Sequence, residues 1–159
     1  MSSTITPKMI FGTAQTVIDS STDIAAGNFG AASTIYDNTS DAAVPYATHA
    51  VATISIPDWA AAPVAGTTVD LWGVIQDTDG TSDDTDAPSG TSAGGARFFG
   101  SWTIAAADAL QRRTITISMD GIKKVAFYLK NGTAQNMNND GGTNVILKVT
   151  PFVYGAVVA

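Results

Sequence analysis

Apolar and polar residues alternate with a period of two along several short stretches of this chain. Successive side chains of a β-strand point to opposite faces, so this alternation predicts half-buried strands. The expected strands are residues 13–18, 47–56, 67–76, 96–104, 113–119, 123–130 and 144–158.

Four of these segments present a clear apolar face. The residues expected to point inward are Ala50, Ala52, Ile54, Ile56, Val69, Leu71, Gly73, Ile75, Ile115, Ile117, Met119, Val125, Phe127 and Leu129. Turn signals at Asp120-Gly121 and Asn131-Gly132 separate the strands, and Pro151 divides the last segment into one or two strands. Short strands at this spacing predict an all-β sandwich or barrel, with at most one short helix near residues 105–111.

The composition fits one β domain. The chain has 159 residues, of which 45% are hydrophobic and 14% charged, so it is long and apolar enough to bury a core. Residues 1–12 are expected to form an N-terminal arm and residues 13–159 the domain. Every acid is Asp and cysteine is absent, which removes a good helix former and all thiolate chemistry. We expect no transmembrane helix and no signal peptide, and therefore synthesis in a cytoplasm.

Charge is distributed unevenly. Eleven Asp and one Lys precede position 97, whereas seven Lys or Arg and three Asp follow from there. Such asymmetry predicts a bipolar surface. In a sandwich the two halves interleave in space, so a mixed surface is the alternative.

The segment DTDGTSDDTDAP, residues 77–88, is the most acidic part of the chain. Its carboxylates at Asp77, Asp79, Asp83 and Asp84 are candidate calcium ligands, because Ca²⁺ binds six to eight hard oxygens. The spacing departs from the usual calcium loop, since Gly80 comes early and no Glu follows. A solvated loop is the alternative, and an acid–base pair for hydrolysis is a third interpretation. No other cofactor is expected.

The remaining chemistry is sparse. His49 has no second histidine or cysteine with which to share a metal, so a surface or half-buried histidine is expected. Trp59, Trp72 and Trp102 fit a core, or alternatively a sugar-stacking face. Arg112, Arg113, Lys123 and Lys124 alternate between faces, and the net charge is −6, so no nucleic acid is expected as a partner.

Residues 67–154 resemble small virion structural proteins of tailed bacteriophages. The stretches that carry the resemblance are TVDLWGVIQDTDGTSDDTDAP, ARFFGSWTI, QRRTITI, KVAFYLKNGTAQNM and NVILKVTPFVYG. The resemblance implies a jelly-roll-like β-sandwich that decorates or cements the outer capsid, or a fibre or tail accessory. It implies a virion location after assembly in the bacterial cytoplasm, and it assigns no catalytic residues.

Both ends of the chain are candidate contact segments: residues 1–12 are Ser/Thr-rich with isolated apolar residues, and the C-terminal tail is apolar and uncharged. The arm carries Ile5, Met9, Ile10 and Phe11 as candidate interface residues, which fits a strand added to a neighbour's sheet edge; a frayed terminus is the alternative. The tail FVYGAVVA is expected to be paired inside the fold or across a subunit contact, because an exposed apolar strand aggregates. The expected function is non-enzymatic bridging of neighbouring capsid subunits, with the major capsid protein and further copies, as dimer or trimer, as partners. The alternative is a glycan-binding or fibre module.

Overall fold

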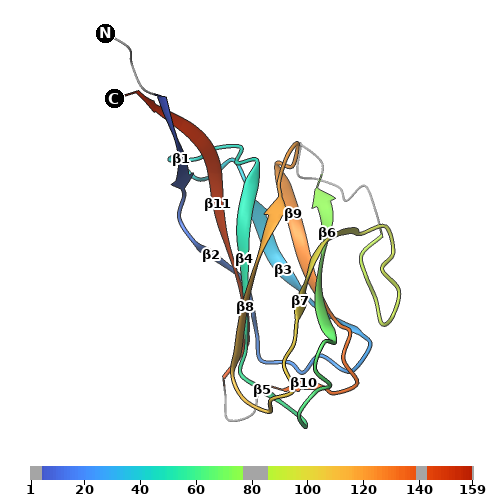
Figure 1. The fold of residues 1–159 in the computed structure, drawn as a ribbon. Helices are drawn as coiled ribbons and strands as arrows, with labels where there is room; N and C mark the ends of the chain where they lie inside the picture. Colours follow the sequence, from blue (N-terminus) through green and yellow to red (C-terminus); the bar gives the residue numbers. More distant parts are fainter. Residues whose placement is uncertain (1–4, 77–85, 139–142, 159) are drawn as a thin grey trace.

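A computed structural model describes residues 5–76, 86–138 and 143–158. Within these ranges the fold is an all-β sandwich of antiparallel strands, as the sequence predicts (Figure 1). The segment expected to allow a helix is irregular. Gln111 satisfies the backbone there instead: its Oε1 accepts from Ala105 N at 3.0 Å, and its Nε2 donates to Ala105 O at 3.1 Å and Ala107 O at 3.0 Å. No helix among the described residues is long and apolar enough to cross a bilayer.

Strands from the first half of the domain pair with strands from the second half in nested order. The four pairs are β2 (Gln15–Ser20) with β11 (Val145–Val158), β3 (Phe29–Asp37) with β9 (Lys124–Asn131), β4 (His49–Ile56) with β8 (Gln111–Ser118), and β6 (Thr68–Gln76) with β7 (Arg97–Thr103). One sheet has the strand order β2-β11-β4-β8, and the sheet that faces it has the order β3-β9-β6-β7. Eight strands wound in this way form a jelly roll.

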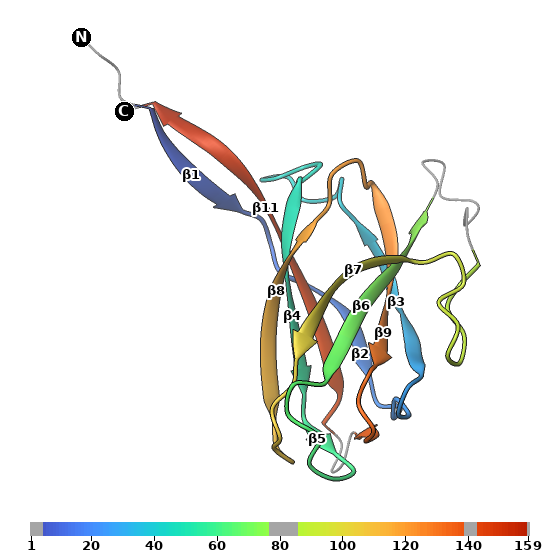
Figure 2. The same cartoon turned by 45° about the vertical axis from the view of Figure 1, so that its right-hand side comes forward.

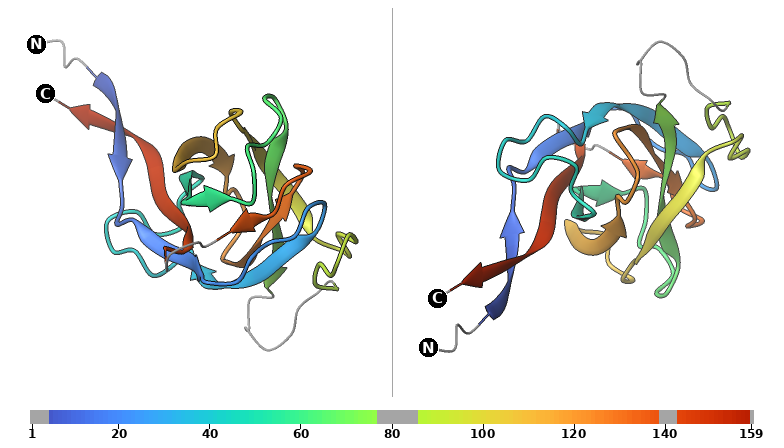
Figure 3. Two further views of the ribbon diagram at one scale, coloured as in Figure 1. Left: turned by 90° about the horizontal axis from the view of Figure 1, so that it is seen from below. Right: turned by 90° about the horizontal axis from the view of Figure 1, so that it is seen from above.

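Three short elements complete the fold. β1 (Ile5–Phe11) pairs with the end of β11, and β5 (Asp58–Trp59) pairs with β10 (Met137–Asn138). Viewed from below and above, the β1–β11 pair lies outside the body of the sandwich (Figure 3).

The core lies between the two sheets. The predicted inward faces of β4 and β9 are confirmed, since Ala50, Ala52, Ile54, Ile56, Val125, Phe127 and Leu129 are buried. Alternation on β8 also holds: Ile117 is buried and Thr114 and Thr116 are exposed, and Met119, directly after the strand, is buried as well. Sequence reasoning missed β3, whose Gly30, Ala31, Ala32 and Ser33 give no apolar alternation.

β11 runs through Pro151 as one continuous strand. Its pairing with β2 ends at Val149 and its pairing with β1 begins at Phe152, so Pro151 lies at the junction between the two neighbours. The missing proline N–H therefore removes no sheet hydrogen bond, while Pro151 O accepts one from Gly12 N at 2.8 Å.

Candidate assembly surface

A two-stranded ribbon projects from the sandwich and carries both chain ends (Figure 2). It forms because β4 pairs with β11 only as far as Phe152, opposite His49, whereas β11 continues to Val158. β1 pairs with this continuation from Phe11 opposite Phe152 to Ile5 opposite Val158. An isolated pair of strands is marginally stable in water, so a ribbon of this kind needs further contacts.

The base of the ribbon is an aromatic cluster on the outer face of the sandwich. His49 stacks on Phe152 with ring centroids 5.4 Å apart, and Phe11 lies 5.4 Å from the same ring. Tyr154 meets Phe152 and His49 edge-on at 5.6 Å. Phe152 is 1% exposed yet lies outside the central core cluster, so its neighbours on the outer face bury it.

The ribbon itself remains apolar and exposed. Phe11 is 51% exposed, Tyr154 65%, Met9 40% and Ile10 39%. Phe11, Met9 and Tyr154 share the face that continues the outer surface of the sheet, because Met9 is opposite Tyr154 and Phe11 opposite Phe152. Ile10 lies on the reverse face and crosses Gly155, where an added Cβ would come within 2.7 Å of Ile10 Cδ1. Both faces therefore present apolar surface.

A carboxylate fixes the ribbon to the sandwich. Asp41 accepts hydrogen bonds from Thr13 N at 2.5 Å, Ala43 N at 2.8 Å and Val44 N at 3.2 Å. The Thr13 bond, followed by that of Ala43, lowers the pKa of Asp41. The loop between β3 and β4 is thereby tied to the segment that joins β1 and β2.

The predicted interface residues of the arm fall into two groups. The structure places Met9, Ile10 and Phe11 together on the ribbon, and it describes Ile5 only as a backbone position of β1. The described part of the arm pairs with the chain's own β11 rather than lying free. Sequence reasoning missed His49, Phe152 and Tyr154 as neighbours. A usable signal was present, since Lys148 and Thr150 fix the outward positions of β11, and Phe152 and Tyr154 continue that series.

The predicted calcium ligands Asp77, Asp79, Asp83 and Asp84 lie outside the described residues, so the calcium site stays a prediction. Among the residues that are described, no three His, Asp or Glu side chains gather as a metal site would require.

One pair of described carboxylates is in contact. Asp108 is exposed and its carboxyl group is hydrogen-bonded to that of Asp58. The pKa of Asp108 is raised, first by desolvation and then by this hydrogen bond and the negative charge of Asp58. The pair lies on the surface, at the segment between β7 and β8 and at β5.

The three tryptophans separate by face. Trp59 and Trp102 are 2% and 1% exposed in the core, where Trp102 Nε1 donates to Ala52 O at 3.3 Å. Trp72 is half-buried on the outer face of the other sheet, with its ring centroid 5.3 Å from Phe98 and 5.8 Å from Phe29. Phe98 is 49% exposed, so this second aromatic cluster reaches the surface.

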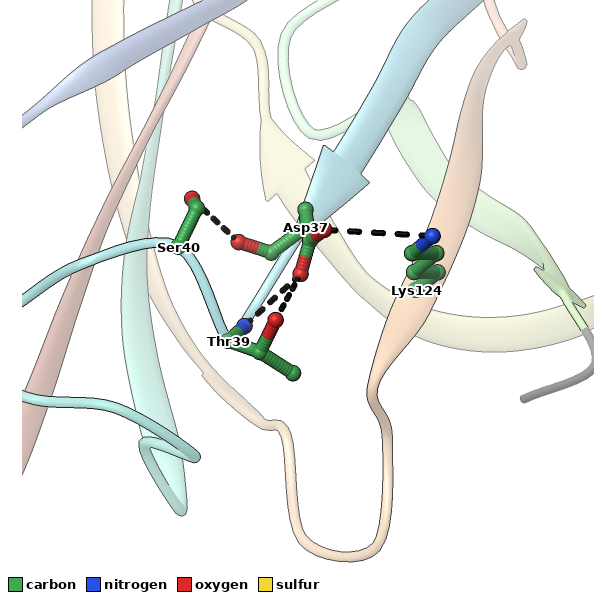
Figure 4. Close-up of polar contacts among 4 residues, drawn as sticks. All are labelled: Asp37, Thr39, Ser40 and Lys124. Atoms are coloured by element: carbon green, nitrogen blue, oxygen red, sulfur yellow. Dashed lines mark hydrogen bonds and ion pairs between the residues drawn. The ribbon is translucent and has the colours of Figure 1, made fainter. Parts of the chain in front are cut away.

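The charged side chains follow the nested pairing. Asp37 from the acidic half lies beside Lys124 from the basic half, with Nζ 3.9 Å from Oδ2 (Figure 4). Thr39 N at 2.9 Å and Thr39 Oγ1 at 2.6 Å also bond this carboxylate. These contacts, with the Thr39 hydroxyl first, lower the pKa of Asp37. At this point opposite charges meet, as expected for a mixed surface.

The two neighbouring arginines of β8 point to opposite faces. Arg112 lies on the outer face of β8 beside Ser55, whereas Arg113 turns to the opposite face and donates to Thr103 O at 3.2 Å.

No family model, curated protein or solved structure matches this chain.

Proposed function

We propose that this chain is a structural protein of a tailed-bacteriophage virion, which decorates or cements the capsid by bridging neighbouring capsid subunits. The observation that carries the proposal is the projecting apolar ribbon, which has exposed side chains on both faces and no core beneath it. The resemblance of residues 67–154 to phage virion proteins supports the setting, and the partners are the major capsid protein and further copies of the chain.

The ribbon supplies a binding free energy of useful size. Full burial of a large apolar side chain contributes about 2 kcal/mol, and a half-exposed one about half of that. Met9, Ile10, Phe11 and Tyr154 are each between 39% and 65% exposed. Together they offer several kcal/mol per contact before the cost of association. Repeated over many copies on one particle, contacts of this size resist the pressure of packaged DNA.

Add-back of the purified protein to virions that lack it tests this proposal. Genome release on heating is followed with a DNA-binding dye, and the wild-type protein is expected to raise the release temperature. The Tyr154→Ser variant is expected to restore less protection, because it removes exposed apolar surface from the ribbon. Ile35→Ser is the matched control, since Ile35 is 54% exposed on β3, away from the ribbon. Equal release temperatures with and without the wild-type protein would contradict cementing.

A glycan-binding or fibre module is the second candidate, favoured by Trp72 and Phe98 on the outer face of β6 and β7. Exposed aromatic rings stack on sugars, and jelly rolls occur in lectin domains as well as in capsids. A glycan array is the test: binding that Phe98→Ala abolishes would favour this candidate, and an array without any bound glycan would remove it.

A further inference from the structure

The two free edges of the ribbon are chemically different. Gly12 N donates to Pro151 O, so odd-numbered residues of the β11 continuation point their backbone groups toward β1. By the same alternation, Tyr154, Ala156 and Val158 point theirs to the side that β4 has left. On β1, Ile5, Pro7, Met9 and Phe11 point theirs outward.

Only the β1 edge carries features that prevent strand pairing. Pro7 has no N–H to offer at an outward-pointing position, and Lys8 adds a charge next to it. Proline and lysine are the usual means by which natural edge strands avoid further pairing. The edge of Val153–Val158, sequence VYGAVV, contains neither, and it combines strand-forming residues with zero charge.

We propose that two copies of this chain pair through this open edge of β11, antiparallel and about a two-fold axis at Ala156. This register is the one in which all three outward-pointing residues find partners: Ala156 lies opposite itself, and Tyr154 lies opposite Val158 of the second copy. The result is a continuous four-stranded sheet, β1-β11-β11-β1, with the protected β1 edges outermost. A two-fold contact uses the same edge of both copies, so pairing leaves no open β11 edge for a third copy and no fibre forms.

Charge favours a second copy as the occupant of this edge. The chain carries a net charge of −6, and copies that approach through most of their surface repel each other. The ribbon carries only Lys8 as a charged residue, and in the paired sheet the two Lys8 residues are at least three strand spacings apart, more than about 14 Å. The dimer deepens the proposed function, on which it rests only in treating the ribbon as an assembly element.

Light scattering on the purified protein tests the pairing. The expected mass is twice the 16.3 kDa of one chain at high micromolar concentration. Ala156→Pro removes an N–H from the open edge without removing a bond to β1, and it is expected to give a monomer. Met9→Pro removes an outward N–H from the other edge, and this matched control is expected to stay dimeric. Circular dichroism establishes that both variants remain folded.

Cysteine cross-linking tests the register independently. The chain has no cysteine, so an introduced thiol is unique. Opposed hydrogen-bonded residues lie about 5.5 Å apart between Cα atoms, within disulfide range, so Ala156→Cys is expected to give a covalent dimer on mild oxidation. Met9→Cys is expected to remain monomeric on a denaturing gel. A monomeric wild type, or equal cross-linking of both variants, would overturn the dimer, whereas the heating experiment on virions would be unaffected.

Discussion

Phe152 connects the ribbon to the sandwich, so its truncation is expected to loosen the ribbon before the body. Its ring contacts Phe11, His49 and Tyr154, with centroids 5.4 to 5.6 Å away, and only 1% of the residue is exposed. Phe152→Ala removes the one ring that all three neighbours share. Phe152 belongs to the outward-pointing series of β11 and lies outside the central core cluster, so the packing between the two sheets is expected to be kept.

The expected cost is about 3 kcal/mol of unfolding free energy. Truncating a buried Phe to Ala typically costs about 3–5 kcal/mol, and the outer face can partly collapse, which places this variant at the lower end. For a domain of this size, about 3 kcal/mol corresponds to a fall in Tm of roughly 6–12 °C. Phe11→Ala is the matched control: its ring is 51% exposed and contacts Phe152, so about 1 kcal/mol is expected.

Urea unfolding gives the two free energies, and hydrogen exchange locates the change. In Phe152→Ala the amides of β1 and of the end of β11 are expected to exchange by local opening of the ribbon, faster than those of β9. The exchange of the β9 amides is expected to follow the global free energy of unfolding. All samples are compared at one protein concentration, because association also protects amides. The reasoning is refuted if Phe152→Ala costs no more than Phe11→Ala, or if the amides of β1 exchange no faster than those of β9 in Phe152→Ala.

Three further changes test other groups. Asn131→Asp is expected to cost about 3 kcal/mol of unfolding free energy at neutral pH. The Asn131 amide donates to Ile24 O at 3.0 Å and to Gln135 O at 2.7 Å, and a carboxylate in its place would face both carbonyl oxygens with no proton to donate. The pKa of this carboxyl would be raised in the folded state, so stability returns as pH falls, which urea midpoints measure. Burial, followed by the charges of Asp41 and Asp37, raises the pKa of Tyr36 from 10.0 to about 12, so stability is lost as pH rises between these values; Tyr36→Phe should flatten the alkaline limb of Tm against pH. The lowered pKa of Asp41 contributes stability above its ordinary value of 3.8 that is lost as pH falls through the folded value, so Asp41→Asn should show a weaker acid dependence of Tm than the wild type.

Local patterning accounts for the strands that were predicted correctly. On β4 and β8 the burial alternates along the strand, so the inner face of each could be assigned from its own residues. On β9 the residues predicted to point inward are buried, but Ala126 and Tyr128 are buried on the other face as well. β3 was missed because small residues occupy its first half, and its pairing with β9 includes two register shifts. The expected interruption at Pro151 did not form, since only the positions of β1 and β2 reveal that no bond was needed there.

For the candidate surface, the sequence identified Met9, Ile10 and Phe11 as apolar residues that needed a partner. It did not indicate that Tyr154, Phe152 and His49 lie beside them, because Phe152 and Tyr154 are separated from β1 by most of the chain and His49 lies on a different strand.

The sequence by itself determined that this chain is built of short β-strands and which faces of β4 and β8 are buried, because a period of two is a local property of the backbone. Only the tertiary structure decided that Gln15 pairs with Val149 and Ile5 with Val158. It also decided that β11 extends beyond its last partner on β4 and leaves an open edge there. Such pairings join residues more than a hundred positions apart, and the alternation of one strand carries no information about which other strand will meet it.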